Sequence, residues 1–194
     1  MSDTLRNDVD LFYELGQLGQ LQRTYLYTNS APTVAAHTHR VAIVALVLAR
    51  KEGADVEKTL LMALMHDAPE VRTGDPTPFQ KSFISKDDHL AASSQFAETS
   101  LADMVELLTE YEKRECLEAK IVKDADMLVA ELEMCELTAR GHGYPVAFMA
   151  ERDSVLPRLR TETAKQMFTK IREVSPFDWI RKGPNAYKDG KMGL

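Results

Sequence analysis

The chain has 194 residues, of which 44% are hydrophobic and 28% charged, and its formal net charge is −6. The charge excludes broad attraction to nucleic-acid polymers and anionic membranes, and no apolar run reaches the ~20 residues that span a bilayer. The N-terminus, MSDTLRNDVD, lacks the order of a signal peptide, and Cys116 and Cys135 form no CxxC pattern, so we expect a cytoplasmic protein with reduced thiols.

The N-terminal half reads as a series of helices. Apolar residues recur at helical spacing over 9–21, and the stretch VAIVALVLA (41–49) is apolar on nearly every face. This second pattern favours a buried central helix of roughly 15 residues, which Gly53 ends. Asp55 is placed to cap the next helix, which runs through VEKTLLMALMHD.

The C-terminal half is also predicted to be helical. Pro76 and Pro78 mark a loop, and the stretch SKDD (85–88) resembles a capping box. The expected helices are one from there to about Tyr111, a long one over 114–141 stopped by Gly141, and two more within 144–174 split at Pro157. We therefore expect one all-α domain over 1–194, with a tail over 175–194 that hugs the surface or frays.

The chemistry-bearing residues begin with His66 and Asp67, which follow an apolar run and precede Pro69. Adjacent residues on a regular helix point about 100° apart, so their side chains converge poorly. Pro69 removes a helical hydrogen bond and should end or kink the helix at this pair. The exit then lets an imidazole and a carboxylate converge on one ion, although a capped helix end with a packed histidine also fits the dipeptide.

Partners for this pair lie on two other predicted helices. His37 shares a face with Val41 and Leu48, and Asp126 lies among apolar residues of the long helix. A carboxylate in such a setting needs a partner, whereas Asp124 fits a surface turn. Two histidines and two carboxylates from three helices make a complete site for a divalent metal, and helical bundles often build such sites.

The order of these residues resembles the HD-domain metal-dependent phosphohydrolases, and in particular their 5'-deoxynucleotidase branch. The segments that carry the resemblance are LQRTY, TVAAHTHRVAIV, HDAPEVRTGDPTP (66–78) and EYEKRECLEAKIVKDAD (110–126). Together they span a motif-bearing core of about residues 8–140. The resemblance implies an HD-domain helical bundle and a homodimer.

The resemblance also implies a role for each matched residue. One divalent ion (Co²⁺, Mn²⁺, Mg²⁺, Zn²⁺ or Fe²⁺) would be held by His37, His66, Asp67 and Asp126. Arg23 would grip the substrate phosphate, and Glu70, on the loop after the metal pair, would orient or deprotonate the attacking water. Asp75, Pro76 and Thr77 would contact sugar and phosphate.

Two positions depart from the family pattern. The family commonly has a glutamate before the first histidine, where this chain has Ala36. An aromatic residue usually follows the arginine and packs at the deoxyribose, whereas here Thr24 follows and Tyr25 comes one later. The first departure concerns support of the metal, and the second concerns the choice between deoxyribose and ribose.

The expected reaction is hydrolysis of 5'-(deoxy)nucleoside monophosphates to nucleoside and phosphate. Two alternatives stay open. One is an HD phosphohydrolase that acts on nucleoside triphosphates or alarmones, and the other is a metal-stabilised binding protein without turnover. A purely structural site needs only metal ligands, so the presence of Arg23, Glu70 and Asp75 favours an enzyme.

Overall fold

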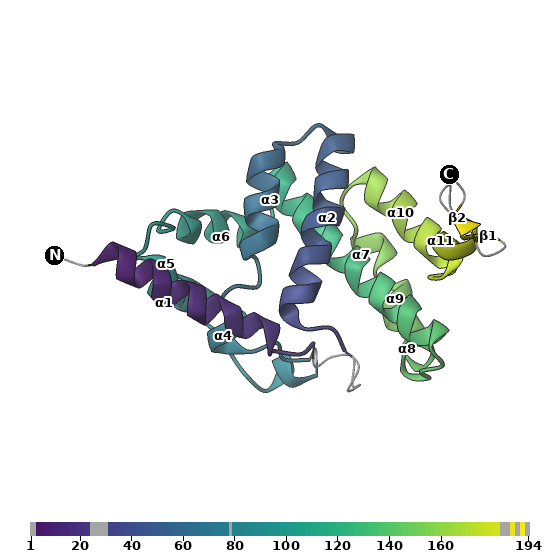
Figure 1. Ribbon diagram of the computed structural model, residues 1–194, viewed down its shortest axis with the longest axis horizontal. Coiled ribbons are helices and arrows are strands. Elements are labelled where there is room, and N and C mark those ends of the chain that lie inside the picture. Colours follow the sequence, from purple (N-terminus) through teal and green to yellow (C-terminus); the bar gives the residue numbers. More distant parts are fainter. Residues whose placement is uncertain (1–2, 24–30, 78, 183–186, 189–190, 193–194) are drawn as a thin grey trace.

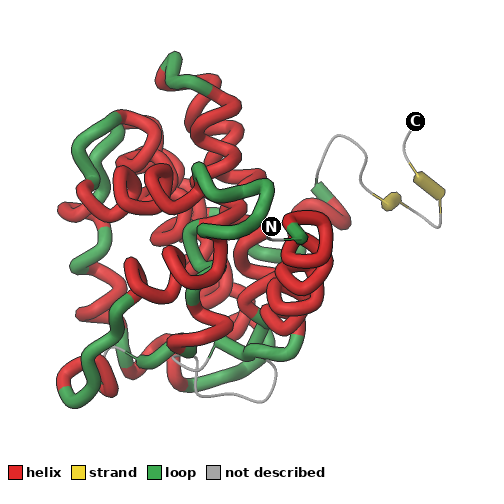
Figure 2. Tube along the Cα trace, turned by 90° about the vertical axis from the view of Figure 1, so that its left-hand side faces the viewer, coloured by secondary structure: helices red, strands yellow, loops and turns green. Residues whose placement is uncertain are grey.

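Helices make up nearly all the regular structure of the computed structural model (Figure 1). The structure describes residues 3–23, 31–77, 79–182, 187–188 and 191–192. Figure 2, in which helices are red, shows from the side that most of the described chain is helical. The expected all-α class is confirmed. Among the described residues the strands are one short antiparallel pair in the tail, β1 (Tyr187–Lys188) and β2 (Lys191–Met192).

The first helix differs in its bounds from the expectation of a helix over 9–21. Helix α1 spans Thr4–Gly16 and begins earlier because the Asp3 side chain caps it, accepting from the Arg6 N–H. A single 3₁₀ turn, η1 (Gln17–Gly19), follows. A bridge between Gln22 and Thr33 then places Arg23 near the start of the next helix.

The central hairpin follows the prediction. Helix α2 (Val34–Glu52) ends at Gly53, whose φ of 72° is the left-handed conformation that glycine adopts without strain. Helix α3 (Val56–Met65) begins at Asp55, which accepts a hydrogen bond from the Lys58 N–H at 3.0 Å. Asp55 as the cap of α3 and Gly53 as the end of α2 are both confirmed.

The exit from α3 is a sharp turn. The helix ends at Met65, residues 66–69 form turns, and the one-turn helix α4 (Glu70–Thr73) follows. The predicted interruption before Pro69 is therefore confirmed, whereas Glu70 opens a helical turn and not a loop. Ala68, at the centre of the exit, is buried in an apolar cluster with Leu11 and Phe96, which fixes the turn against α1 and against the later helix that ends at Phe96.

The helix expected from 85–88 to about Tyr111 is two helices, so that prediction was wrong. After the 3₁₀ turn η3 (Gln80–Ser82), α5 spans Asp88–Phe96 and α6 spans Met104–Lys113. The break coincides with polar side chains that capture backbone groups. Thr99 donates to the Phe96 carbonyl at 2.8 Å, and the Ser100 hydroxyl and N–H both donate to the Asp8 carboxylate.

The remaining helices begin with α7 (Leu117–Ala139), the longest described helix, which Gly141 follows at φ 88°. The expected pair of C-terminal helices is more broken than predicted, because Thr161 caps a fresh start after Pro157. The elements are α8 (Tyr144–Ala147), α9 (Met149–Asp153), η4 (Leu156–Arg158), α10 (Glu162–Glu173) and α11 (Asp178–Arg181).

The main core lies where α2, α3, α7 and α10 meet. Its fully buried members include Leu48 of α2, Met62 of α3, Leu128 of α7 and Phe168 of α10. α2 packs along α7, and α3 packs against both, so the three helices that carry the expected metal ligands share one core. Across the described residues, no helix has both the length and the apolarity to cross a bilayer.

Candidate metal centre and substrate cavity

Three of the four expected ligands converge from three different elements. One ligand atom each of His37 on α2, His66 after α3, and Asp126 on α7 lies within 4.8 Å of the other two. The two imidazole ring centroids are 6.1 Å apart. Both histidines are buried, and Asp126 keeps 17% of its side chain exposed toward a cavity.

Hydrogen bonds to the second ring nitrogens orient both imidazoles. His66 Nδ1 lies 2.8 Å from the Ala63 carbonyl, which can only accept, so Nδ1 donates to it and Nε2 is the ring nitrogen left to face the centre. His37 Nδ1 lies 3.0 Å from Glu133 Oε1, and its Nε2 lies 3.1 Å from Asp126 Oδ1. Each ring thus turns Nε2 toward the shared centre.

Asp67, the fourth expected ligand, lies at the same centre. Its Oδ2 is 3.2 Å from His66 Nε2, yet both atoms are buried and neither has a hydrogen-bond partner among the described residues. Buried polar atoms without partners are costly. A divalent cation would satisfy both, and a set of two imidazoles and two carboxylates suits such an ion, so the residues present fit a metal.

Protonation in the metal-free centre follows from burial and paired charges. Burial acts to lower the pKa of His37, but hydrogen bonds with Asp126 and Glu133 outweigh it and raise this pKa to about 9. Burial acts to raise the pKa of Asp67, but the neighbouring His66 and Arg23 lower it to about 2. The metal-free centre therefore holds the Asp67 carboxylate, which is ready to bind a cation, and a His37 imidazolium, whose proton a cation would have to displace.

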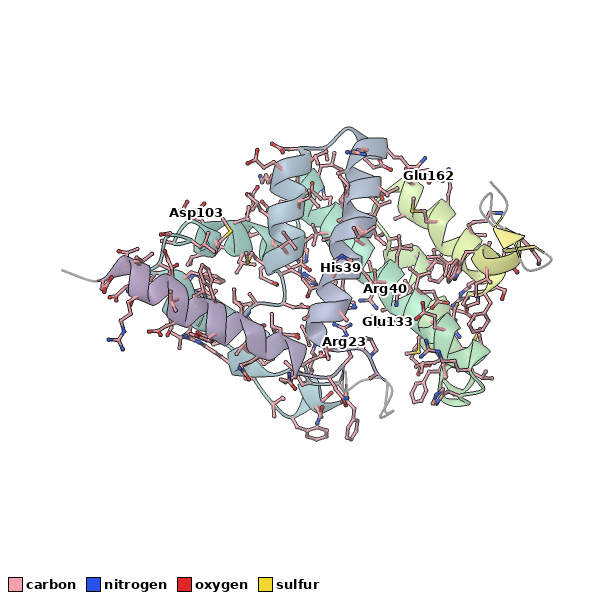
Figure 3. The ribbon with its side chains drawn as sticks, in the orientation of Figure 1. Arg23, His39, Arg40, Asp103, Glu133 and Glu162 are labelled. Atoms are coloured by element: carbon pink, nitrogen blue, oxygen red, sulfur yellow. The ribbon has the colours of Figure 1, made fainter. Side chains whose placement is uncertain are left out.

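Arg23 reaches the centre from the segment between η1 and α2. Its backbone N–H donates to the Pro32 carbonyl at 3.0 Å, which fixes it beside the start of α2 (Figure 3). The buried guanidinium lies between two carboxylates, 3.6 Å from Asp67 Oδ2 and 3.7 Å from Asp75 Oδ2. Thr24 and Tyr25, which follow Arg23 where the chain departs from the family pattern, lie outside the described residues.

Glu70 enters the same space from the first residue of α4. Burial, together with the negative charges of Asp67 and Asp75, raises its pKa to about 9. Its Oε2 is buried without a hydrogen-bond partner in the described part of the chain. Lys86 lies 3.8 Å from Glu70 Oε1 and donates to the Gly74 carbonyl at 2.9 Å.

The loop after α4 forms a wall of the site. Gly74 turns the chain at φ 72°, and Asp75, Pro76 and Thr77 are all buried. Thr77 is fixed by a reciprocal pair, in which its N–H donates to Gln80 Oε1 and its hydroxyl accepts from the Gln80 N–H. The expected substrate-binding residues thus share one rigid loop next to Arg23.

These residues line a single cavity of about 1300 Å³. Its lining comes from the loop after α4 and from α5, α6, α7 and α9. Arg23, Glu70, Asp75 and Asp126 all border it. The cavity is larger than the 300–1,000 Å³ usual for small-molecule sites, so a nucleotide can enter beside the metal centre.

Asp124 is not on a surface turn, which corrects the expectation. It is fully buried, and its carboxylate accepts from the N–H groups of Arg160 and Thr161 and from the Thr161 hydroxyl. The sequence reasoning failed because these partners lie 36 and 37 residues away. Asp124 therefore joins α7 to the start of α10.

Two residues at the site were not singled out as functional from the sequence. Glu133 contacts His37, and Lys86 approaches Glu70. From the sequence, Lys123, one turn before Asp126, could face the phosphate or be structural, and it lies 2.7 Å from Asp126 Oδ2. Glu133 could have been found from its helical spacing of seven residues relative to Asp126. Lys86 could not, because its approach depends on the path of the loop before α5.

Comparisons with known proteins agree with this arrangement. The family model of the HD domain matches residues 15–171. The 5'-deoxynucleotidase YfbR of Escherichia coli is 36% identical over 150 residues, which cover 68% of this chain and 74% of that protein. The structure of a conserved hypothetical protein from Pyrococcus furiosus has a TM-score of 0.72 and 26% identity, and the match covers 86% of this chain and 99% of that one.

A further solved structure shows the same fold. A predicted metal-dependent phosphohydrolase from Magnetospirillum magnetotacticum has a TM-score of 0.68 at 24% identity, with 88% of this chain and 90% of that one covered. The chain belongs to the HD-domain family. The expected class, an HD-domain phosphohydrolase, is thereby confirmed.

Proposed function

We propose that this enzyme hydrolyses 5'-(deoxy)nucleoside monophosphates to nucleoside and phosphate, with one divalent metal ion held by His37, His66, Asp67 and Asp126. The observation that carries the proposal is the position of Arg23 and Glu70 at the rim of the same centre. A metal site with a buried guanidinium and a buried carboxylate beside it has the parts that phosphoryl transfer to water requires. The similarity to a 5'-deoxynucleotidase supports the substrate class.

The phosphate would be bound between the metal centre and Arg23. A divalent ion in this centre would lower the pKa of a bound water and neutralise phosphate oxygens. Arg23 stays charged and can bind phosphate oxygens bidentately. Its present neighbours, Asp67 and Asp75, hold the guanidinium in the cavity wall before substrate arrives.

Glu70 would accept the proton of the attacking water. Cations in the site would favour the ionised form of Glu70. Because the pKa of Glu70 is raised, this ionised carboxylate would take up a proton readily. The water oxygen forms the new bond to phosphorus, the bond from phosphorus to the 5'-oxygen breaks, and the leaving oxygen takes up a proton. Lys86, beside Glu70, holds that carboxylate at the cavity wall.

The loop of Asp75, Pro76 and Thr77 would bind the sugar end of the substrate. Its burial and the Thr77–Gln80 hydrogen bonds keep it in place without substrate. A rigid wall lowers the ordering cost of binding. The finer expectations of a homodimer and a cytoplasmic location stay predictions.

The test is phosphate release from a panel of nucleotides after the metal has been stripped and replaced. The panel contains deoxy- and ribonucleoside 5'-monophosphates, 3'-monophosphates, triphosphates and an alarmone, each with Co²⁺, Mn²⁺, Mg²⁺, Zn²⁺ and Fe²⁺. We expect inorganic phosphate from the 5'-monophosphates alone. His37→Ala should abolish release, and the matched variant His39→Ala, on an exposed position of the same helix, should not.

The other outcomes separate the alternatives. Release of triphosphate or pyrophosphate would assign the chain to the triphosphate or alarmone hydrolases. Metal binding without turnover of any panel member would favour a metal-stabilised binding protein.

A further inference from the structure

The imidazole of His37 lies between two carboxylates of the same helix. Glu133 Oε1 is 3.0 Å from Nδ1 and Asp126 Oδ1 is 3.1 Å from Nε2. The His37 side chain is fully buried, and the Glu133 side chain is 1% exposed. Glu133 does not border the substrate cavity among its described lining residues, so it reaches the metal centre through His37.

The register of α7 explains how one helix supplies both contacts. Asp126 and Glu133 are seven residues apart, which is close to two helical turns, so they lie on one face. That face packs along α2, and Figure 3 shows Glu133 on the side of α7 near α2. His37 meets both carboxylates because its ring lies across the contact between the two helices.

A buried carboxylate at this place needs a reason, because burying a charge is costly unless it is paired. One partner of the Glu133 carboxylate is His37, whose Nδ1 lies 3.0 Å from Oε1 and whose side chain is itself fully buried. Arg40, the nearest cation of α2 in sequence, pairs with Glu136.

We infer that Glu133 is a positioning residue of the metal centre. It accepts the Nδ1–H of His37, which fixes the tautomer that leaves the Nε2 lone pair for the metal, and it holds the ring orientation. Its negative charge makes the imidazole a more basic ligand. The inference rests on the proposed metal centre and adds a residue outside the four ligands.

The experiment measures metal affinity in place of activity. Wild type, Glu133→Gln and Glu133→Leu are stripped of metal and checked by circular dichroism for native helix content at the titration temperature. Co²⁺ and Zn²⁺ are then titrated in competition with a coloured chelator. We expect about 10–100-fold weaker binding in Glu133→Leu. Glu133→Gln, which keeps an acceptor but loses the charge, should be weakened less.

The matched control is Glu136→Gln, three residues further on the same helix, in a half-exposed pair with Arg40. Its metal affinity should equal that of wild type. The visible absorption spectrum of bound Co²⁺, which reports ligand geometry, should change in the Glu133 variants and not in the control.

Two results would overturn the inference. If Glu133→Gln binds both metals as tightly as Glu136→Gln, Glu133 does not position a metal ligand. The comparison of these two variants tests the inference even if Glu133→Leu does not fold. If wild type itself binds neither metal, the metal centre and the inference fail together. Tight wild-type binding with unaffected Glu133 variants overturns the inference alone.

Discussion

The carboxylate of Asp124 accepts two hydrogen bonds from Thr161, one from its N–H and one from its hydroxyl, each 2.8 Å long. Thr161 in turn accepts from the Ala164 N–H and so caps α10. Both residues are buried. Two aspartates of α7 that are two residues apart therefore have different tasks, since Asp124 fastens a helix and Asp126 faces the metal centre.

Asparagine substitutions should separate these tasks. Asp126→Asn removes a charged ligand and should greatly reduce bound metal. Asp124→Asn should keep the metal but lower the free energy of unfolding by about 2–4 kcal/mol, because buried donors lose a charged acceptor. Metal content by elemental analysis and urea denaturation of both variants provide the measurement. Metal loss in Asp124→Asn with a stable fold would show that the two assignments are reversed.

Removal of the metal should abolish turnover and lower the thermal midpoint. A ligand that binds only the folded state stabilises it by about 2.7 kcal/mol at a free concentration of 100 times its Kd. The melting temperature is measured with excess chelator and again after each divalent ion is restored. Full activity in excess chelator, with no metal found by elemental analysis, would contradict metal dependence.

Glu70→Ala should keep the metal and lose most of the rate. Glu70 is not among the four proposed ligands, and a general base typically contributes ~10²–10⁴-fold. The loss should appear mainly in kcat, because the phosphate is held elsewhere. Arg23→Ala should instead impair both KM and kcat. Steady-state kinetics are compared with those of Glu57→Ala, an exposed position on α3. A near-normal kcat in Glu70→Ala would require another base.

The metal-free protein should lose stability as pH rises from about 6.5 to about 9. The pKa of His37 is raised from 6.5 to about 9, so its contribution is fully present below 6.5 and is lost as pH passes 9. Glu70, whose pKa is raised from 4.5 to about 9, acts in the same direction, since the folded state holds more protons than the unfolded one. Urea midpoints of the stripped protein across this range test the sign, and a rise with pH would contradict it.

Metal affinity should rise with pH, whereas the stability of the metal-free protein falls. The ion competes with the proton on His37, so affinity should increase with pH up to about 9. Chelator competition at several pH values measures it, and a pH-independent affinity would show that His37 is already neutral in the metal-free protein.

Local patterns predicted much of the site. Pro69 after His66 and Asp67 predicted a helix end, and the apolar setting of Asp126 predicted a carboxylate with a partner. Both signals are contained within a few residues. The prediction of an unbroken helix through Ser100 was wrong, because the break depends on Asp8, which is 92 residues away in sequence.

The partners of other residues could not be read from one segment. Asp124 has the same local surroundings as Asp126, and only the return of Thr161 reveals its burial. Lys86 approaches Glu70 only because the loop before α5 passes over α4. Contacts between segments that are distant in sequence therefore complete the candidate site. The periodicity of a single helix cannot predict them.

Four of the acidic residues of α7 form two stripes, each with a seven-residue spacing. Asp126 and Glu133 both contact His37, whereas Asp124 and Glu131 face the C-terminal segments, with Glu131 binding Arg152 and Arg172. One residue inserted or deleted between Asp126 and Glu131 would rotate the rest of the helix by about 100° and misdirect the second half of both stripes. This stretch of α7 should therefore tolerate no change in length, and insertions among relatives should fall outside it.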